Sequence, residues 1–188
     1  SLYGSKYLAD WLNTLSNCNK EKVIIVPGGG PFADQVRQAD QQFKLDQVLA
    51  HNMAVLSMQQ FGYVMASLCP KLYLANSQEQ IYTCWNQEKV VIWEPYDMVC
   101  RYCALEKSWE VSSDSLAAWL AKYLLADHLL YVKSSEKILP KATIEELVKQ
   151  GCIDICLPKL IKGTNISVQF MHKTQANNFS NYLIDNSE

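Results

Sequence analysis

Short runs of consecutive apolar residues alternate along this chain with segments in which apolar residues recur at helical spacing. The runs at 23–26, 90–93 and 129–132 are apolar at every position, which is typical of strands that helices cover on both faces of a sheet. This alternation is characteristic of α/β proteins, because a helix returns the chain so that the next strand runs parallel to the last. The sequence therefore predicts an α/β fold with a mostly parallel sheet and helices on both of its faces.

The periodicity places five strands and the helices between them. Strands are predicted at 23–26, 72–74, 90–93, 129–132 and 166–171. Helices are predicted at 8–15, from 33 onward, at 45–68, in a short segment from 77, from 114 onward, at 143–150 and at 177–184. Ser77 with Gln80, and Thr143 with Glu146, have the spacing of capping boxes, and Gly151 is expected to end the helix before it.

Length and charge limit the class of protein. The 188 residues suit one domain, and 17 Lys and Arg against 19 Asp and Glu give a net charge of −2. Without a sequence-wide positive field, we expect neither nucleic acid nor an anionic membrane surface as a partner. The most apolar long stretch, 116–132, is interrupted by Lys122, Asp127 and His128, and no basic-then-apolar leader opens the chain. We expect a cytoplasmic protein without a membrane span.

Seven cysteines form an odd set in a domain large enough to fold without disulfides, so reduced thiols are expected. Cys100 and Cys103 form a CxxC pair, and Cys152 and Cys156 form a CxxxC pair, so four thiolates could hold a structural zinc ion. No histidine lies near either pair, and cysteine is also a common small core residue. We predict no protein-bound metal site and keep the zinc site as the minor alternative.

Two loops could hold a ligand, because ligands of parallel α/β sheets bind where strands end and helices begin. Gly28, Gly29 and Gly30 leave a predicted strand and enter a helix, so their N–H groups could approach an anion at the helix N-terminus. A tight turn that needs a positive φ would also require glycine. The spacing matches neither the GxGxxG of dinucleotide-binding folds nor the GxxxxGK of P-loop NTPases, so both classes are disfavoured.

The second loop, 109–115, precedes the helix that contains Leu116. Capping of this helix by Asp114 or Ser113 would explain the polar residues of the loop without any chemistry. The occurrence of both loops in one chain favours a ligand site.

The residues of these loops resemble the amino acid kinase superfamily, which includes acetylglutamate kinase, aspartokinase and uridylate kinase. The likeness lies in VIIVPGGGPFADQVR at 23–37 and SWEVSSDSLAAWL at 108–120. It is greatest to the short branch of aminomethylfuran phosphate kinases of methanofuran biosynthesis and their bacterial relatives. Segment 49–54 and Ile153-Asp154 also look like that branch, so the resemblance spans most of the chain.

The resemblance implies a three-layer αβα sandwich and transfer of the γ-phosphoryl group of MgATP to a carboxylate, phosphate or similar oxygen. Gly28, Gly29 and Gly30 would face the acceptor and the moving phosphoryl group. Asp114 would hold catalytic lysines in place, and Ser112 and Ser113 are expected to bind substrate in the same loop. Backbone N–H donors and lysines suit this reaction, because phosphoryl transfer needs positioning and positive charge around three equatorial oxygens.

Three more residues are candidates for binding. Arg37, on the helix after the glycines, could pair with an anionic acceptor or form a surface salt bridge. Lys133 and Ser134 stand where the family has a nucleotide loop of the type Thr-Asp-x-x-Gly, but residues 133–137 here read KSSEK. Lys133 could supply positive charge at the phosphates of ATP, or it could be an exposed lysine.

Family members open with a strand that carries Lys-x-Gly-Gly-Ser, whereas this sequence starts with Ser1-Leu2-Tyr3-Gly4. We therefore expect one amino acid kinase-like domain over 1–188 that lacks the first strand and its Lys-x-Gly-Gly. The expected function is an ATP- and Mg²⁺-dependent small-molecule kinase with an anionic acceptor, such as an aminomethylfuran phosphate. The alternatives are a catalytically impaired nucleotide- or metabolite-binding module and a uridylate kinase-like nucleoside monophosphate kinase. Family members usually dimerise, and the sequence allows a homodimer.

Overall fold

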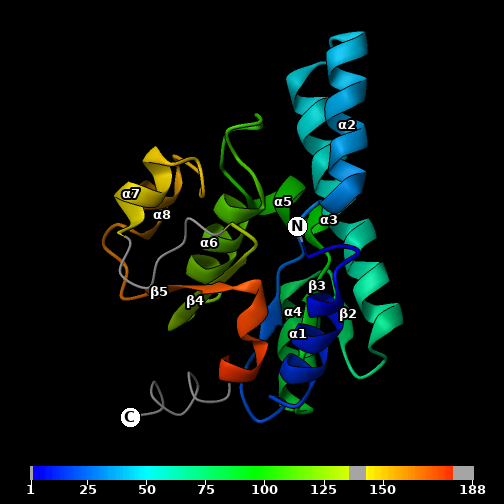
Figure 1. Cartoon of the computed structure of the whole chain (residues 1–188), viewed down its shortest axis with the longest axis vertical. Coiled ribbons are helices and arrows are strands. Elements are labelled where there is room, and N and C mark those ends of the chain that lie inside the picture. Colours follow the sequence, from blue (N-terminus) through cyan, green and yellow to red (C-terminus); the bar gives the residue numbers. More distant parts are fainter. Residues whose placement is uncertain (1, 136–142, 180–188) are drawn as a thin grey trace.

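The structure is a computed structural model that describes residues 2–135 and 143–179 (Figure 1). Strands and helices alternate along most of the described chain. The elements are α1 (Lys6–Ser16), β1 (Ile24–Ile25), α2 (Gly30–Phe43), α3 (Gln47–Leu68), β2 (Tyr73–Ala75), α4 (Gln78–Asn86), β3 (Val91–Trp93), α5 (Pro95–Tyr102), α6 (Ser113–Tyr123), β4 (His128–Lys133), α7 (Ile144–Lys149), α8 (Leu157–Ile161), β5 (Ser167–His172) and the 3₁₀-helix η1 (Lys173–Asn178).

The described strands pair in parallel. β3 lies between β1 and β2, with Leu74 opposite Ile92, and β4 pairs with β5 along its whole length, ending with Lys133 opposite His172. The predicted α/β class, the five strands and their parallel arrangement are confirmed. The hydrogen bonds between the described strands form two sheets, one of three strands and one of two, rather than one continuous sheet.

Strand β3 is the centre of three layers. Val91 and Trp93 pack in one core cluster with side chains from α4, α5 and α6, and Ile92 packs in a second cluster with side chains from α1; α3 contributes side chains to both clusters. All three side chains are fully buried, because successive residues of a strand point to opposite faces and helices cover both. The predicted sandwich arrangement is confirmed (Figure 1).

The expectation that strand 23–26 is buried on both faces is confirmed only in part, because Ile24 packs against the cluster of Val91 and Trp93 and Ile25 against that of Ile92, but neither is fully buried. Ile24 and Ile25 are only half-buried, because β1 has a hydrogen-bonded neighbour on one side only within the described sheet. The continuous apolar run therefore indicated a strand correctly, but it did not distinguish an edge strand from a central one.

The longer predicted helices are present, and two short ones were missed. α1 buries Leu8, Trp11 and Leu12, and α3 matches the predicted helix 45–68. The missed helices α5 and α8 carry Pro95 and Pro158 in their first turns, where a helix needs no N–H donor. Among the described residues, no helix combines the length and the apolar character that a bilayer crossing requires.

The capping predictions are confirmed in full at α7 and in half at α4. Thr143 and Glu146 form both hydrogen bonds of the capping box, and Gly151 follows α7 with a φ of +66°. Ser77 accepts from the N–H of Gln80, but the Gln80 side chain accepts from the N–H of Asn76 instead of Ser77. Of the predicted helix 177–184, residues 180–184 lie outside the described residues.

Helix α3 approaches β3 closely at Gly62. A side-chain carbon at this position would lie 3.3 Å from Cγ2 of Ile92 and 3.4 Å from Cγ of Pro27. We expect Gly62→Val to lower the free energy of unfolding by about 1–3 kcal/mol, because the added carbons overpack this contact. Ser67→Val, at an exposed position of α3, should change it by less than about 0.5 kcal/mol. Urea denaturation measures the free energy of unfolding of both variants. Equal values for Gly62→Val and the wild type would contradict the prediction and would mean that α3 can shift away from the sheet.

Candidate active site

The glycine loop after β1 lies beside the N-terminus of α6. A side-chain carbon added to Gly28 would lie 3.7 Å from the Oγ of Ser113. Gly29 lines one pocket together with Ser112 and Ser113. The two loops that the sequence singles out are thus neighbours in space, although about 80 residues separate them along the chain.

The three glycines of this loop are needed for different structural reasons. Gly30 has a φ of +54°, and its open side faces Tyr3 and Phe61, so the tight turn explains this glycine. A side-chain carbon at Gly29 would lie 2.4 Å from Cβ of Ala33 in α2. Gly28 is therefore the glycine whose backbone adjoins the start of α6, whereas Gly29 packs against α2 and α3.

Helix α6 is capped by Ser112. The backbone of Ser112 is extended, and its Oγ accepts from the N–H of Asp114 at 3.3 Å. The predicted capping by Asp114 or Ser113 is wrong, because the helix begins at Ser113 and both residues lie inside its first turn. The carboxylate of Asp114 is therefore not used as a cap.

Asp154, between α7 and α8, holds the N-terminus of α6. Its Oδ2 accepts from the N–H of Ser112 at 2.8 Å and from the N–H and Oγ of Ser115 at 3.2 and 2.7 Å. Its Oδ1 accepts from the Oγ of Ser112 at 2.8 Å. A carboxylate at a helix N-terminus also interacts favourably with the helix dipole. Asp154 lies about 40 residues beyond the serines, so the sequence indicated it only as part of the family resemblance at Ile153-Asp154 and assigned it no role.

The carboxylate of Asp114 forms an ion pair with the ammonium of Lys133, the last residue of β4. The two side chains are 13% and 19% exposed, so the pair is largely shielded from water. Tyr131 donates its hydroxyl to the backbone oxygen of Asp114 at 2.7 Å, and its ring centroid lies 5.5 Å from the Lys133 ammonium. These contacts fix the ammonium at the carboxyl end of β4.

The electrostatics of this pair are set mainly by burial. Burial raises the pKa of Asp114; the Lys133 ammonium opposes this rise, and the nearby charge of Asp154 adds to it. Burial also raises the pKa of Tyr131, and both carboxylates add to that rise. The phenol therefore stays protonated and keeps its hydrogen bond to Asp114.

A narrow pocket of about 70 Å³ is bounded by α2, α3 and the segment before α6. Arg37 is the one cationic side chain among the residues that line it, and Ser112 and Ser113 stand at its α6 side. The lining contains no carboxylate. Its apolar walls come from Ala33, Ala54, Val55, Met58, Val111 and Leu116.

Arg37 forms the predicted surface salt bridge and also lines the pocket, and its pairing with an anionic acceptor stays a prediction. Its Nη1 donates to Asp34 at 2.7 Å in an exposed i,i+3 salt bridge, and its side chain also lines the pocket. His51, in α3, lines the same pocket and is only 4% exposed. Burial lowers the pKa of His51, so its neutral ring can donate from Nδ1 to the Ser108 carbonyl at 3.3 Å.

The remaining predicted residues are less informative. Ser134 directly follows β4 and is half-buried, and Glu136 and Lys137 of the predicted nucleotide loop lie outside the described residues. All seven cysteines are free thiols. Within residues 2–135 and 143–179, no three His, Cys, Asp or Glu side chains are grouped to hold a metal ion, so the four cysteines of the zinc alternative do not form a site.

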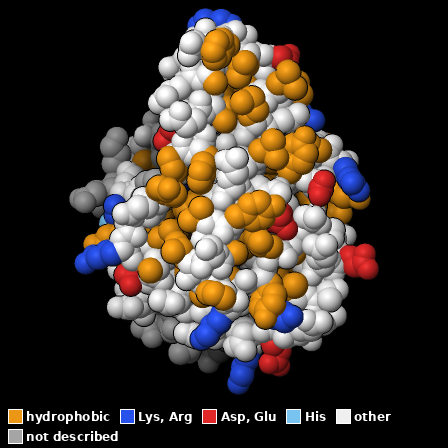
Figure 2. All heavy atoms as spheres, turned by 90° about the vertical axis from the view of Figure 1, so that its right-hand side faces the viewer, with side chains coloured by type: hydrophobic (Ala, Val, Ile, Leu, Met, Phe, Trp, Pro, Cys, Tyr) orange, Lys and Arg blue, Asp and Glu red, His pale blue; other side chains and the backbone are white. Residues whose placement is uncertain are grey.

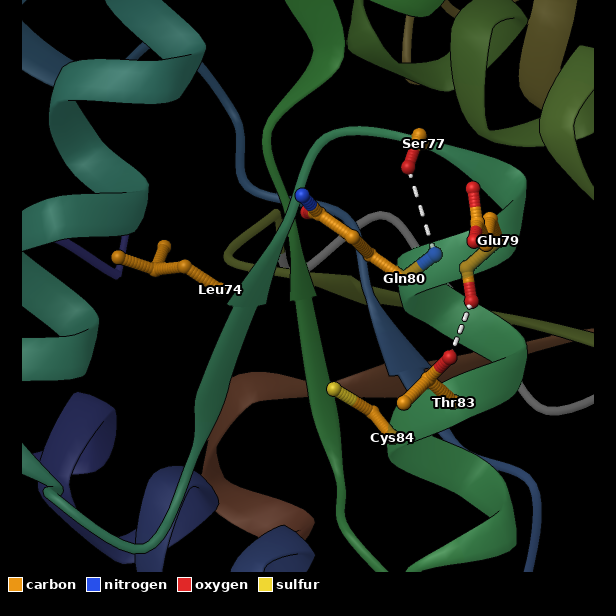
Figure 3. A pocket seen from close by; sticks show the side chains of 6 residues that line it. All are labelled: Leu74, Ser77, Glu79, Gln80, Thr83 and Cys84. Atoms are coloured by element: carbon orange, nitrogen blue, oxygen red, sulfur yellow. Dashed lines mark hydrogen bonds between the residues drawn. The ribbon is translucent and has the colours of Figure 1, made fainter.

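A wider depression of about 340 Å³ lies at α4 beside β2, and Figure 3 shows its six lining residues. The hydroxyl of Ser77 accepts from the N–H of Gln80, and the hydroxyl of Thr83 donates to the backbone oxygen of Glu79 at 2.8 Å. These polar groups serve α4 itself. None of the predicted site residues lines this depression.

Asp114→Asn tests whether the carboxylate stabilises the fold. Because its folded pKa is raised above the unfolded value, Asp114 favours folding at low pH, and this contribution is lost as pH rises through the folded pKa. At pH 7 we expect a melting temperature within about 5 °C of wild type. As pH falls toward about 4, near the unfolded pKa, the wild type should gain stability relative to the variant. Thermal melts over this range measure both; a loss above about 3 kcal/mol at pH 7 would contradict the expectation and would mean that the variant leaves the Lys133 ammonium buried without a counter-charge.

The chain is similar to proteins of one family in both sequence and fold. It matches the amino acid kinase family over residues 4–150. It is 32% identical over 125 residues to the (5-(aminomethyl)furan-3-yl)methyl phosphate kinase of Methanocaldococcus jannaschii, and the alignment covers 65% of this chain and 56% of that relative. The chain therefore spans little more than half the length of that relative.

Two solved structures share the fold at low sequence identity. The uridylate kinase from Archaeoglobus fulgidus superposes with a TM-score of 0.64 and 16% identity, over 91% of this chain and 86% of that one. The UMP kinase from Ureaplasma parvum gives a TM-score of 0.67 and 15% identity, over 98% of this chain and 88% of that one. Since the family match covers most of the sequence, and the fold agrees with it, the chain belongs to the amino acid kinase family.

Proposed function

We propose that the protein transfers the γ-phosphoryl group of MgATP to the phosphate of a small phosphomonoester. The acceptor that we propose is an aminomethylfuran phosphate in methanofuran-type cofactor biosynthesis, the class named for the relative from Methanocaldococcus jannaschii. All seven thiols are unpaired, which supports the cytoplasm as the place of the reaction, because thiols stay reduced there.

The observation that carries the proposal is the Lys133 ammonium held by Asp114 near the start of α6, whose first turn adjoins the glycine loop. Phosphoryl transfer needs little covalent help and depends on positive charge and N–H donors around the moving group. Lys133 would supply the charge, and the backbone of Gly28 and Gly29 would allow close approach. The N–H groups of Asp114 and Ser115 are already occupied by Ser112 and Asp154, so this helix start serves to position Asp114.

The proposed roles of the other residues follow from their contacts. Ser113, beside Gly28, would contact the acceptor, whereas Ser112 is engaged as the helix cap and in hydrogen bonds with Asp154. Ser134 would lie on the nucleotide side, next to Lys133. Mg²⁺ would arrive with ATP, held by the phosphates, because the described residues contain no group of three metal ligands and Mg²⁺ commonly uses few protein ligands beside phosphates.

The pocket lining suits a small anionic acceptor. Its walls are apolar apart from a few polar groups, and its volume of about 70 Å³ encloses neither a furan phosphate nor a nucleotide whole, so its size does not decide between them. Arg37 offers one positive charge for an anionic group. We rank a uridylate kinase activity second, because the furan phosphate kinase is 32% identical to this chain and the two uridylate kinases only 16% and 15%.

Lys133→Met tests the kinase and the role of the ammonium together. Loss of a preorganised charge at the transferred group should lower kcat by about 10²-fold or more. Lys122→Met, an exposed lysine of α6, should leave kcat unchanged. The measurement is Mg²⁺-dependent ATP consumption by the purified full-length protein with (5-(aminomethyl)furan-3-yl)methyl phosphate, and separately with UMP.

The outcomes of this assay separate the alternatives. Micromolar ATP binding without transfer to either acceptor would overturn the proposal in favour of a nucleotide-binding module. Faster transfer to UMP than to the furan phosphate would identify a nucleoside monophosphate kinase. Equal rates for wild type and Lys133→Met would remove Lys133 from the mechanism.

We also propose that two copies of the chain pair through α3. This helix contains no Asp, Glu, Lys or Arg, and its outer face exposes Leu49, Met53, Leu56 and Tyr63. These residues are four, three and seven positions apart, the spacing of a seam between two helices. Figure 2 shows hydrophobic side chains gathered over this side of the molecule. A surface helix without charges on either face is normally covered.

Leu56→Lys tests the homodimer. The Leu56 side chain is 41% exposed in the single chain, so a lysine there should leave the fold intact and place a charge in the seam. Light scattering after gel filtration should give a dimer for wild type and a monomer for Leu56→Lys. Gln41→Lys, at an exposed position of α2, should remain a dimer. A monomeric wild-type protein at micromolar concentration would contradict the proposal.

A further inference from the structure

The segment 103–112, between α5 and α6, is attached to α2 and α3 at two points beside the pocket. Trp109 donates its indole N–H to Oδ2 of Asp40 at 2.8 Å, and the carbonyl of Ser108 accepts from the buried His51 at 3.3 Å. Both Trp109 and His51 line the pocket. The segment therefore forms one wall of the pocket, and that wall is attached to α2 and α3.

Asp40 is well placed as the attachment point. Its Oδ1 accepts from the N–H of Leu45 at 3.1 Å, just beyond the end of α2, so both carboxylate oxygens are engaged. A hydrogen bond to a charged acceptor is worth more than one between neutral groups. The carboxylate thus joins the last turn of α2, the turn before α3 and the segment that carries Trp109.

The indole of Trp109 also holds the cation of the pocket. The Arg37 guanidinium lies 5.4 Å from the centroid of the Trp109 ring, and Arg37 is three residues before Asp40 on α2. Trp109 is thereby held by Asp40 through its N–H and stacked on Arg37 through its face. The Arg37 side chain is 52% exposed and retains N–H donors beyond the one that Asp34 accepts.

We propose that Trp109, anchored by Asp40, is a specificity-determining residue of the acceptor pocket. It directs the Arg37 guanidinium toward the incoming anion, and its ring forms part of the wall that the acceptor meets. This inference rests on the proposed function, because it takes this pocket as the acceptor site. Asp40 is a positioning residue, since it acts through Trp109.

Two variants separate the roles of the ring and of its hydrogen bond. Trp109→Ala removes both, and Trp109→Phe removes only the bond to Asp40. Trp85→Phe is the matched control, because the Trp85 indole also donates one hydrogen bond, to the Val23 carbonyl at 3.0 Å, and Trp85 does not line the pocket. The Phe variant keeps an aromatic ring in the wall, so it tests the inference even where the Ala variant fails to fold.

Calorimetry without ATP, using (5-(aminomethyl)furan-3-yl)methyl phosphate and UMP as probes, measures specificity independently of catalysis. We expect Trp109→Ala to weaken binding of the furan phosphate by at least about tenfold. The affinity for UMP should rise relative to the affinity for the furan phosphate. Trp109→Phe should fall between wild type and Trp109→Ala, and Trp85→Phe should match wild type. Amides of 103–112 should exchange hydrogen about tenfold faster in Trp109→Phe.

The outcomes for the inference and for the proposed function are distinct. Selective binding of the furan phosphate that is lost in Trp109→Ala, without phosphoryl transfer by the wild type, would refute the kinase and support the inference. Kinase activity with unchanged affinities for both probes in the Trp109 variants would refute the inference alone. Failure of the wild type to bind either probe would overturn the inference together with the proposed acceptor.

Discussion

The carboxylate of Asp154 accepts hydrogen bonds from the N–H and hydroxyl groups of both Ser112 and Ser115. This places the N-terminus of α6 against the segment between α7 and α8, where Leu157 packs with Ala118 and Leu147 in one buried cluster. Asp114 lies between the two serines, so its carboxylate is directed at the end of β4. Asp154 therefore positions Asp114 and Lys133 indirectly, through its hydrogen bonds with Ser112 and Ser115.

The ion pair of Asp114 and Lys133 is better explained by positioning than by stability. Moving two charges out of water costs free energy that their attraction only partly returns, and burial raises the pKa of Asp114. The pair lies at the carboxyl end of a parallel strand, and Ser113, the residue before Asp114, adjoins Gly28; ligands of such sheets bind at this end. A lysine directed in this way can meet a phosphate without first losing side-chain freedom.

Helix α3 links the pocket to the outer surface. Its inner face supplies His51, Val55 and Met58 to the pocket and Phe61 and Met65 to the core, and its outer face is apolar as well. Gly62 lets the helix approach β3 and Pro27, the residue before the glycine loop. The same helix thus supports the loop, forms part of the pocket and offers an uncharged surface to a second copy.

The sequence by itself determined the α/β class, the five strands, the long helices and the two loops, because these features depend on periodicity and on turn and capping residues that act locally. Local pattern did not show that β1 is paired on one side only in the described sheet or that Ser112 rather than Asp114 caps α6. It also missed α5 and α8, whose first turns contain prolines. Asp114 and Lys133 were both candidates, but only the tertiary structure paired them. It also decided the contacts of Asp154 with Ser112 and of Asp40 with Trp109, because their partners lie 42 and 69 residues apart in the chain and meet only when the helices pack.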